Sequence, residues 1–172
     1  MNLKIQRIIF AILTITTFVT IFIFSSQNGE KSSSTSRGFT KKIIEILQLD
    51  KNLSEDEKEN LIENSQFVIR KLAHFTIYTI AGINIYGFVN TYEIKKKNKI
   101  LGVLILGIIY AISDEIHQMF SGDRTPAIRD VFIDSCGVLF GICIFLAINK
   151  IIKIRKNKAI KHKGDLENIQ VT

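Results

Sequence analysis

Four long apolar segments alternate with polar stretches along the chain. They extend over residues 5–24, about 67–89, 100–120 and about 128–152. A helix needs about 20 predominantly apolar residues to cross the hydrocarbon core of a bilayer, and each segment approaches that length. The apolar runs are continuous, whereas the strands of a membrane β-barrel alternate apolar and polar positions. The pattern therefore predicts an all-α integral membrane protein built as a four-transmembrane-helix bundle.

The polar stretch between the first two segments also has a pattern. It opens with a serine-rich piece, 32–36, for which we expect a flexible conformation. Apolar residues then recur at helical spacing: Phe39, Ile43, Ile46 and Leu47. This spacing indicates a short amphipathic helix on the membrane surface or over the mouth of the bundle. Ser54 followed by Glu57 is a capping-box pattern that predicts another short helix, and Ser65 is a candidate cap for the second span.

Basic residues predict how the spans are oriented. Lys and Arg in short flanks tend to stay on the cytoplasmic side of a membrane. They gather before the first span (Lys4 and Arg7), between the second and third (95–99) and after the fourth (150–158). With four crossings these places share one side, so we expect both termini to be cytoplasmic. The connections 25–66 and 121–127 are then extracytoplasmic.

The first segment has an alternative interpretation as a secretory signal peptide, because basic residues precede it. We favour an uncleaved span, since the apolar stretch is long and residues 24–27 offer no cleavage site flanked by small residues. The formal net charge is +7. The basic residues flank apolar runs, so we expect the lipid bilayer as partner and no nucleic acid. We divide the chain into a membrane domain, 1–152, and a basic cytoplasmic tail, 153–172.

Polar residues gather at the predicted extracytoplasmic ends of the spans. Charge at the bilayer centre costs about 2.5–3.5 kcal/mol per residue, so such residues should face a partner, a water-filled cavity or the interface. The densest group ends the third span and comprises Asp114, Glu115, His117 and Gln118. The other spans and the short loop contribute Gln27, Arg70, Lys71, His74, Arg124, Arg129, Asp130 and Asp134. We predict that these side chains line one outward-facing polar pocket.

Helical spacing sharpens this prediction, because residues three or four apart share a face. Asp114 aligns with His117 and Gln118, whereas Glu115 is about 100° away and points to a different neighbour. The spacing also aligns Lys71 and His74 with Tyr78, and Asp130 with Asp134.

Simpler interpretations exist for several of these groups. Arg70 and Lys71 could mark the membrane interface, and Asp130 could favour a helix N-terminus. Asp134 could form a structural ion pair, with Arg70 as one candidate partner. Gly137 and Gly141 predict close helix packing.

The polar motifs occur in a fixed order: Phe24-Ser25-Ser26-Gln27, Arg70-Lys71-x-x-His74-Phe75-x-x-Tyr78, Asp114-Glu115-x-His117-Gln118-x-Phe120, Gly122-x-Arg124, and Asp130-Val131-x-x-Asp134-x-x-Gly137-x-x-x-Gly141. From about residue 8 to 150 this series resembles the VanZ-like family of bacterial membrane proteins. The resemblance implies a small polytopic protein whose namesake is associated with resistance to the glycopeptide teicoplanin. It implies a phenotype and a site, but no reaction.

One position departs from the family pattern. The family often has an acid directly before the tyrosine of the second motif, where this chain has Ile77. If that acid helps to bind a metal or to tune the histidine, this chain must do so differently.

Two functions fit these residues. The first is an enzyme acting on an extracytoplasmic lipid-linked substrate. His74 or His117 would be its general acid or base, and Asp114 would orient the imidazole. The remaining acids in such a site would be Glu115, Asp130 and Asp134. Its phosphate or pyrophosphate ligands would be Arg70, Lys71, Arg124 and Arg129, with Gln27 and Gln118 beside them. A divalent metal would suit the His and carboxylate groups, although the chain has no HExxH motif.

The second function is non-catalytic binding of an anionic lipid head group or of a glycopeptide by the same cations. A transporter is disfavoured, because the apolar stretches 100–112 and 142–148 leave no polar path through the membrane.

Overall fold

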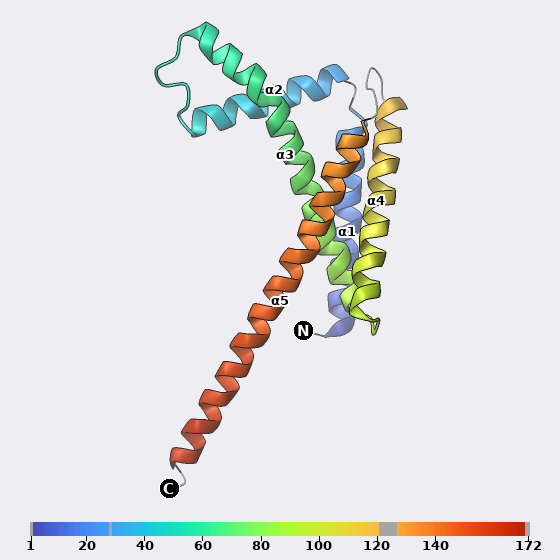
Figure 1. The fold of residues 1–172 in the computed structure, drawn as a ribbon, viewed down its shortest axis with the longest axis vertical. Coiled ribbons are helices and arrows are strands. Elements are labelled where there is room, and N and C mark those ends of the chain that lie inside the picture. The colour runs from blue at the N-terminus through green and yellow to red at the C-terminus, as the bar shows by residue number, and fades with distance from the viewer. Residues whose placement is uncertain (1, 28, 121–126, 171–172) are drawn as a thin grey trace.

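The computed structural model describes residues 2–27, 29–120 and 127–170, with side chains up to residue 160. Five helices make up most of this part of the chain, and no strand occurs in it (Figure 1). They are α1 (Leu3–Ser25), α2 (Gly29–Ile46), α3 (Glu55–Asn90), α4 (Lys96–Phe120) and α5 (Ile128–Gln170). The predicted all-α class is confirmed.

Four of these helices, all except α2, are long and apolar enough to cross a membrane. They form a bundle in which α3 packs against each of the others (Figure 1). The apolar core between them includes Tyr78, Ile85, Val138 and Ile142. Most apolar side chains of α1, such as Ile8 and Ile15, point out of the bundle, as expected for lipid contact. The protein is therefore a helical membrane protein, as the apolar segments predicted.

Helix α2 corrects the expectation of a flexible serine-rich piece. Residues 32–36 lie inside α2, which crosses the first half of α3 and projects with it away from the bundle (Figure 1). Arg37 forms ion pairs with Glu59 and Glu63 of α3. The Gln66 amide donates to the Ser33 carbonyl at 2.9 Å. These contacts between helices outweigh the local preference of serine for loops.

The predicted amphipathic helix is confirmed as the second half of α2. Its buried residues, Thr40 and Ile44, belong to one face. Phe39 and Ile46 of α2 and the following Leu47 remain exposed, which leaves an apolar surface at the end of α2.

The capping box at the start of α3 is also confirmed. The Ser54 hydroxyl accepts from the Glu57 backbone, and the Glu57 carboxylate accepts from the Ser54 backbone N–H at 2.8 Å. The expectation of a separate short helix was wrong, because α3 continues without a break through Ser65 to Asn90. Residues 55–66 contain neither proline nor glycine, so nothing in the local sequence ends the helix there.

Helix α5 likewise continues beyond the fourth predicted span. It runs from Ile128 to Gln170 and carries the chain far from the other helices (Figure 1). Most of the predicted tail, 153–170, is therefore helical. The division into a membrane domain and a cytoplasmic tail stays a prediction.

Glycines bring α3 and α5 into close contact. A Cβ added at Gly137 of α5 would lie 2.6 Å from the Phe75 carbonyl oxygen, and one added at Gly141 would meet the Thr79 carbonyl oxygen. Only glycine allows the two backbones this approach. The predicted packing role of both glycines is confirmed. Asp134 stands three residues before Gly137, so the same approach brings it against α3 near His74.

Candidate functional site

The polar residues meet where α1 and α4 end and α5 begins. We call this the polar end of the bundle; the last turn of α3 and the first turn of α4 lie at the opposite, basic end (Figure 1). Helix α3 passes through the polar end at residues 70–74. Helical spacing predicted this gathering, and the structure shows which side chains face one another.

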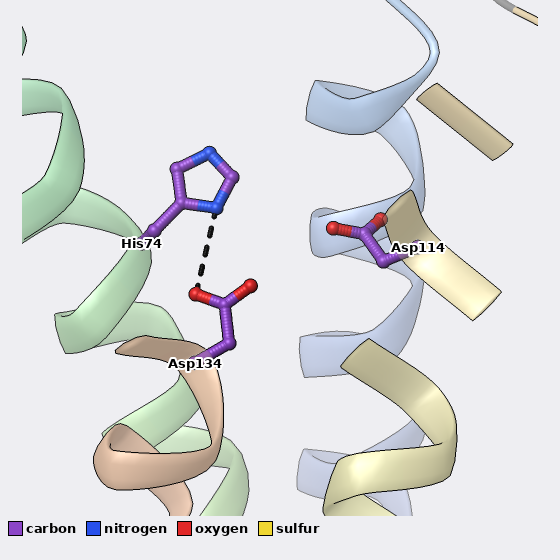
Figure 2. Close-up of side chains that lie close together, drawn as sticks. All are labelled: His74, Asp114 and Asp134. Atoms are coloured by element: carbon purple, nitrogen blue, oxygen red, sulfur yellow. Dashed lines mark ion pairs between the residues drawn. The ribbon is translucent and has the colours of Figure 1, made fainter. Parts of the chain in front are cut away.

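At the centre of the polar end are His74 of α3, Asp114 of α4 and Asp134 of α5. Their side chains point into one space (Figure 2). One possible ligand atom from each lies within 4.8 Å of the other two. Within this space, His74 Nδ1 lies 3.7 Å from Asp134 Oδ1. We call these three residues the acid–imidazole cluster.

The two acids of this cluster are deeply buried. Asp134 is 0% exposed and Asp114 is 5% exposed. Neither Asp134 oxygen has a hydrogen-bond partner among the described residues. Asp114 is better supported, because the Gln118 side-chain N–H donates to its Oδ2 at 3.0 Å. A buried polar atom without a partner costs about 1–3 kcal/mol, and a charged one costs more. The cluster therefore has unused capacity to bind a cation or a proton.

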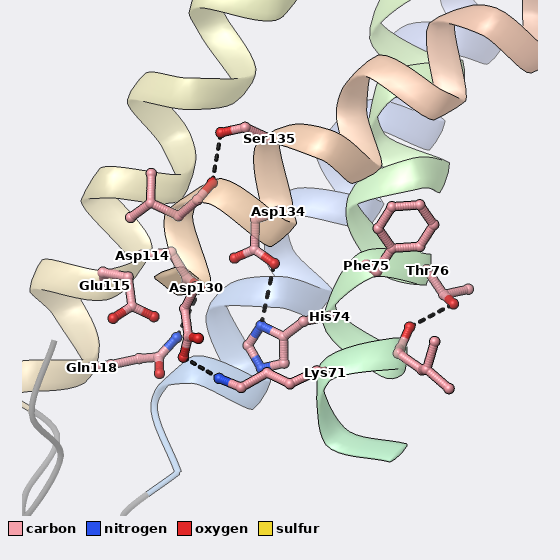
Figure 3. Close-up of polar contacts among 12 residues, drawn as sticks. Lys71, His74, Phe75, Thr76, Asp114, Glu115, Gln118, Asp130, Asp134 and Ser135 are labelled. Carbon is pink, nitrogen blue, oxygen red and sulfur yellow. Dashed lines mark hydrogen bonds and ion pairs between the residues drawn. The ribbon is translucent and has the colours of Figure 1, made fainter. Parts of the chain in front are cut away.

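A second ion pair lies next to the cluster, towards the end of the bundle. Lys71 pairs with Asp130, and His74 pairs with Asp134, so α3 and α5 are joined by two successive contacts (Figure 3). The Lys71 and Asp130 side chains are 18% and 19% exposed, which places this pair at the rim. The predicted alignment of Asp130 with Asp134 is confirmed. The ion pair of Asp134 is with His74, whereas Arg70 was the candidate considered from sequence.

An aromatic ring flanks this rim. The Arg129 guanidinium lies 4.9 Å from the centre of the Phe67 ring, and the Lys71 ammonium lies 5.4 Å from it. Arg129 is exposed and Arg70 is half-buried. The structure therefore brings two predicted phosphate-binding cations to one ring.

Glu115 and His117 face other neighbours. The Glu115 carboxylate accepts from the Ala127 backbone N–H at 2.9 Å, just before α5 begins. The His117 ring stacks on Phe22 with 4.5 Å between ring centres, and its Nε2 lies 2.9 Å from the Ser26 hydroxyl. Phe22 belongs to α1, and Ser26 directly follows that helix. His74 is thus the imidazole of the cluster, and His117 lies against a different helix.

Two further predicted residues are Gln27 and Arg124. Gln27 is half-buried and follows the end of α1, with its backbone N–H donating to Phe24. Arg124 lies outside the described residues.

Tyr78 is a site residue that the sequence prediction did not include. It stands one turn after His74 on α3, is 1% exposed, and its hydroxyl has no hydrogen-bond partner among the described residues. The sequence indicated this role by the spacing of four from His74, which puts both side chains on one helix face. A buried tyrosine hydroxyl usually finds a hydrogen-bond partner. Tyr78 adds a polar hydroxyl to the buried side of the cluster.

Together, these features define a membrane protein with four candidate spans and a buried acid–imidazole cluster at one end of its bundle. The VanZ/LLP1 family model matches residues 10–150. The chain therefore belongs to the VanZ/LLP1 family, and the match includes all three residues of the cluster. Comparisons with curated proteins and with solved structures gave no significant match.

Proposed function

We propose that this protein is a membrane enzyme that acts on a lipid-linked phosphate of the cell envelope and thereby alters glycopeptide susceptibility. The observation that carries the proposal is the buried acid–imidazole cluster with its unpartnered acceptor atoms. A purely structural cluster would satisfy its own hydrogen bonds, because buried polar groups without partners are costly. Groups left unsatisfied in this way are typical of sites that complete their interactions with a ligand.

The polar end faces the extracytoplasmic side in this proposal. The basic end carries Lys96 and Lys99, and α5 carries Lys153 and Lys156 beyond it. Short basic flanks favour the cytoplasmic side, which supports the opposite side for the cluster.

The rim suits a phosphate group at the end of a lipid. Arg129 and Lys71 are cations next to one aromatic ring, and an Arg guanidinium binds phosphate oxygens through two parallel hydrogen bonds. Around the rim, Phe67, Ile128 and Phe132 are exposed apolar side chains that lipid chains can contact. The phosphate would then lie between the rim cations and the cluster.

The cluster would activate the attacking water or hydroxyl group. Carboxylate and imidazole groups accept a proton from a nucleophile that is held within hydrogen-bond reach. The rim cations would stabilise the charge that develops on the phosphate oxygens during the displacement.

The test is turnover by purified protein in lipid nanodiscs. Candidate lipid-linked cell-wall precursors and anionic phospholipids are added, and released phosphate and altered lipid are measured by mass spectrometry. We expect turnover of one lipid class that Asp134→Asn abolishes. Asp56→Asn, in the solvent-exposed first turn of α3, serves as the matched charge-removing control and should keep full turnover. Absence of turnover for every lipid class would contradict the enzymatic proposal.

The second candidate function is non-catalytic binding of an anionic head group or of a glycopeptide. The observation that favours it is the exposed pairing of Arg129 with Phe67, which needs no chemistry at the cluster. Asp114→Asn separates the two functions when the variant reaches normal membrane abundance. Binding predicts a modest change in glycopeptide susceptibility, whereas catalysis predicts nearly complete loss of the effect.

A further inference from the structure

We propose that His74, Asp114 and Asp134 form a binding site for one divalent transition-metal ion, with Mn²⁺ and Zn²⁺ as the probes. This inference deepens the proposed function by naming a cofactor class for the same cluster. Metal binding is measured without turnover, so the two proposals fail separately.

The geometry of the three groups supports the site. Two ligands that bind one ion at about 2.0–2.2 Å are at most about 4.4 Å apart. The ligand atoms of the cluster already lie within 4.8 Å of one another, and their side chains point into one space (Figure 2). Ligand atoms around one tetrahedral ion lie about 3.3–3.6 Å apart, so side-chain rotations that move these atoms by about 1 Å would complete the site.

Electrostatics favours a bound cation at the cluster. Asp114 and Asp134 are two nearly inaccessible carboxylates close together, and their repulsion is strong where water is excluded. The ammonium of Lys71, three residues before His74 on α3, pairs with Asp130. A divalent ion would compensate both acids at once, and imidazole with carboxylates is a common ligand set for Mn²⁺, Fe²⁺ and Zn²⁺.

The surroundings of the cluster resemble those of a supported metal site. The hydrogen bond from Gln118 holds the Asp114 carboxylate in place, as outer residues do for metal ligands. Three protein ligands leave coordination positions open for a water molecule and a phosphate oxygen. An ion with open positions lowers the pKa of its bound water and polarises the phosphate, which is the chemistry that the proposed function requires.

The experiment uses the full chain in nanodiscs after removal of metals with a chelator. Mn²⁺ and Zn²⁺ are titrated by calorimetry, and bound metal is counted by elemental analysis. We expect one equivalent per chain, and a loss of affinity of about 100-fold or more in Asp114→Asn and Asp134→Asn. Asp56→Asn removes one carboxylate charge from the exposed first turn of α3, far along the helix from His74, and should change the affinity by less than about 3-fold.

A measurement on the unmodified protein protects the test against variants that fail to fold. Co²⁺ bound by His and carboxylates at a site of low coordination number absorbs visible light much more strongly than the hydrated ion. A spectrum that stays that of hydrated Co²⁺, or equal metal binding by wild type and Asp134→Asn, would overturn the proposal. Bound metal without lipid turnover would uphold it and remove the enzymatic one. Turnover in excess chelator would uphold the enzymatic proposal and remove the metal site.

An independent observation at the basic end carries a second proposal. A groove of about 650 Å³ lies between the end of α3, the start of α4 and the second half of α5. Its polar lining comprises Asn90, Lys96, Lys99, Asn149, Lys153 and Lys156. We infer that this groove binds the phosphate head group of an anionic phospholipid.

Charge and amphiphilicity both favour a lipid as the occupant. Four ammonium groups line the groove and no acid lies among the lining residues. Their mutual repulsion is relieved by a bound anion. Lys99 is held by the Asn90 side chain at 3.4 Å, which fixes one ammonium at the groove. Leu146 and Ile152 add apolar lining on which an acyl chain can lie. Lysines next to a span commonly bind acidic lipid head groups.

Native mass spectrometry of protein from mixed phosphatidylglycerol and phosphatidylcholine nanodiscs tests this groove. We expect retained phosphatidylglycerol, and a loss of about 30-fold in retention in Lys99→Ala/Lys153→Ala, since each near-surface lysine contributes about 1 kcal/mol. Lys97→Ala/Lys158→Ala removes the same charge from exposed positions outside the lining and should retain the lipid.

Equal loss in both double variants, or equal retention of the two lipids, would overturn this second proposal. Titration with inorganic phosphate identifies the source of the anion. Saturation by free phosphate at the affinity of the lipid would also contradict a lipid site.

Discussion

Lys71 of α3 forms an ion pair with Asp130 of α5 at the rim of the polar end. The pair stands directly beside the contact between His74 and Asp134 and joins the same two helices. Because both partners are only about a fifth exposed, their attraction is screened less than that of a surface pair. The ion pair therefore keeps Asp130 compensated and leaves the deeper acids without that cation.

A double-mutant cycle on this pair should reveal direct coupling. Lys71→Met leaves Asp130 without its cation, and Asp130→Asn leaves Lys71 without its anion, so each single change should lower the thermal stability. The double variant should be less destabilised than the sum, with a coupling of about 0.5–3 kcal/mol. Unfolding in detergent measures this, and strictly additive effects would contradict a direct pair.

The glycine contact between α3 and α5 should be intolerant of even one methyl group. Gly137→Ala places a Cβ 2.6 Å from the Phe75 carbonyl oxygen, so the helices must separate. Such overpacking costs about 1–3 kcal/mol and would also move Asp134 away from His74. Thermal unfolding and Mn²⁺ titration measure the two effects.

Gly102→Ala provides the matched control for that change. A Cβ at Gly102 of α4 has no atom within 4 Å, so alanine should be neutral or stabilise the helix by up to about 1 kcal/mol. If both substitutions have the same effect, the close approach of α3 and α5 is not what Gly137 provides.

The hydrogen bond from Gln118 should matter for metal affinity more than for folding. Gln118→Leu keeps the volume but removes the donor to Asp114 Oδ2. Loss of such an outer contact typically lowers metal affinity by about 10–100-fold. Calorimetric titration with Mn²⁺ checks this expectation, and unchanged affinity would show that Asp114 is held by other groups.

The two predicted histidines of the polar end should behave differently. His74→Ala removes a proposed metal ligand and should abolish tight binding of Mn²⁺. His117→Ala removes a ring stacked on Phe22 of α1, so its main expected effect is a loss of packing between α1 and α4. Metal titration together with thermal unfolding distinguishes them, and equal loss of metal binding would place both imidazoles in the site.

The capping box of α3 should make its first turn sensitive to acid. Hydrogen bonds from Ser54 lower the pKa of Glu57 below its ordinary value of 4.5. A carboxyl group whose pKa is lower in the folded state stabilises that state above pH 4.5. That contribution is lost as the pH falls through the folded-state pKa. Hydrogen exchange at residues 55–58, corrected for its intrinsic pH dependence, should accelerate in this range. Glu57→Gln should remove that acid dependence.

The sequence predicted most of the architecture, because the length of an apolar run determines whether a helix can cross a bilayer. It also placed the polar residues at one end, since four crossings put the ends of α1 and α4 beside the start of α5. The sequence could not tell which imidazole faces the buried acids. His74 and His117 both have polar residues three or four positions away on the same helix. Only the packing of α3 on α5 determines that His74 is the one that faces Asp134.

Contacts between distant segments explain the remaining differences. The serine-rich residues 32–36 favour loops locally, yet the contacts of Arg37 and Ser33 with α3 hold this stretch against that helix. Ser65 has the chemistry of a helix cap, but the surrounding residues favour an unbroken helix. In both cases the local preference of the residues was weaker than the effect of their neighbours in the folded chain.

The uninterrupted course of α3 has a mechanical consequence. A helix of 36 residues is about 54 Å long, which exceeds the hydrocarbon thickness of about 30 Å. Helix α2 packs on the first turns of α3, and the same unbroken helix positions His74 deeper in the bundle. Asp134 belongs to α5, so tilting the first turns of α3 together with α2 would move the His74 imidazole relative to the Asp134 carboxylate. A molecule that binds α2 from outside would thereby change the geometry of the acid–imidazole cluster.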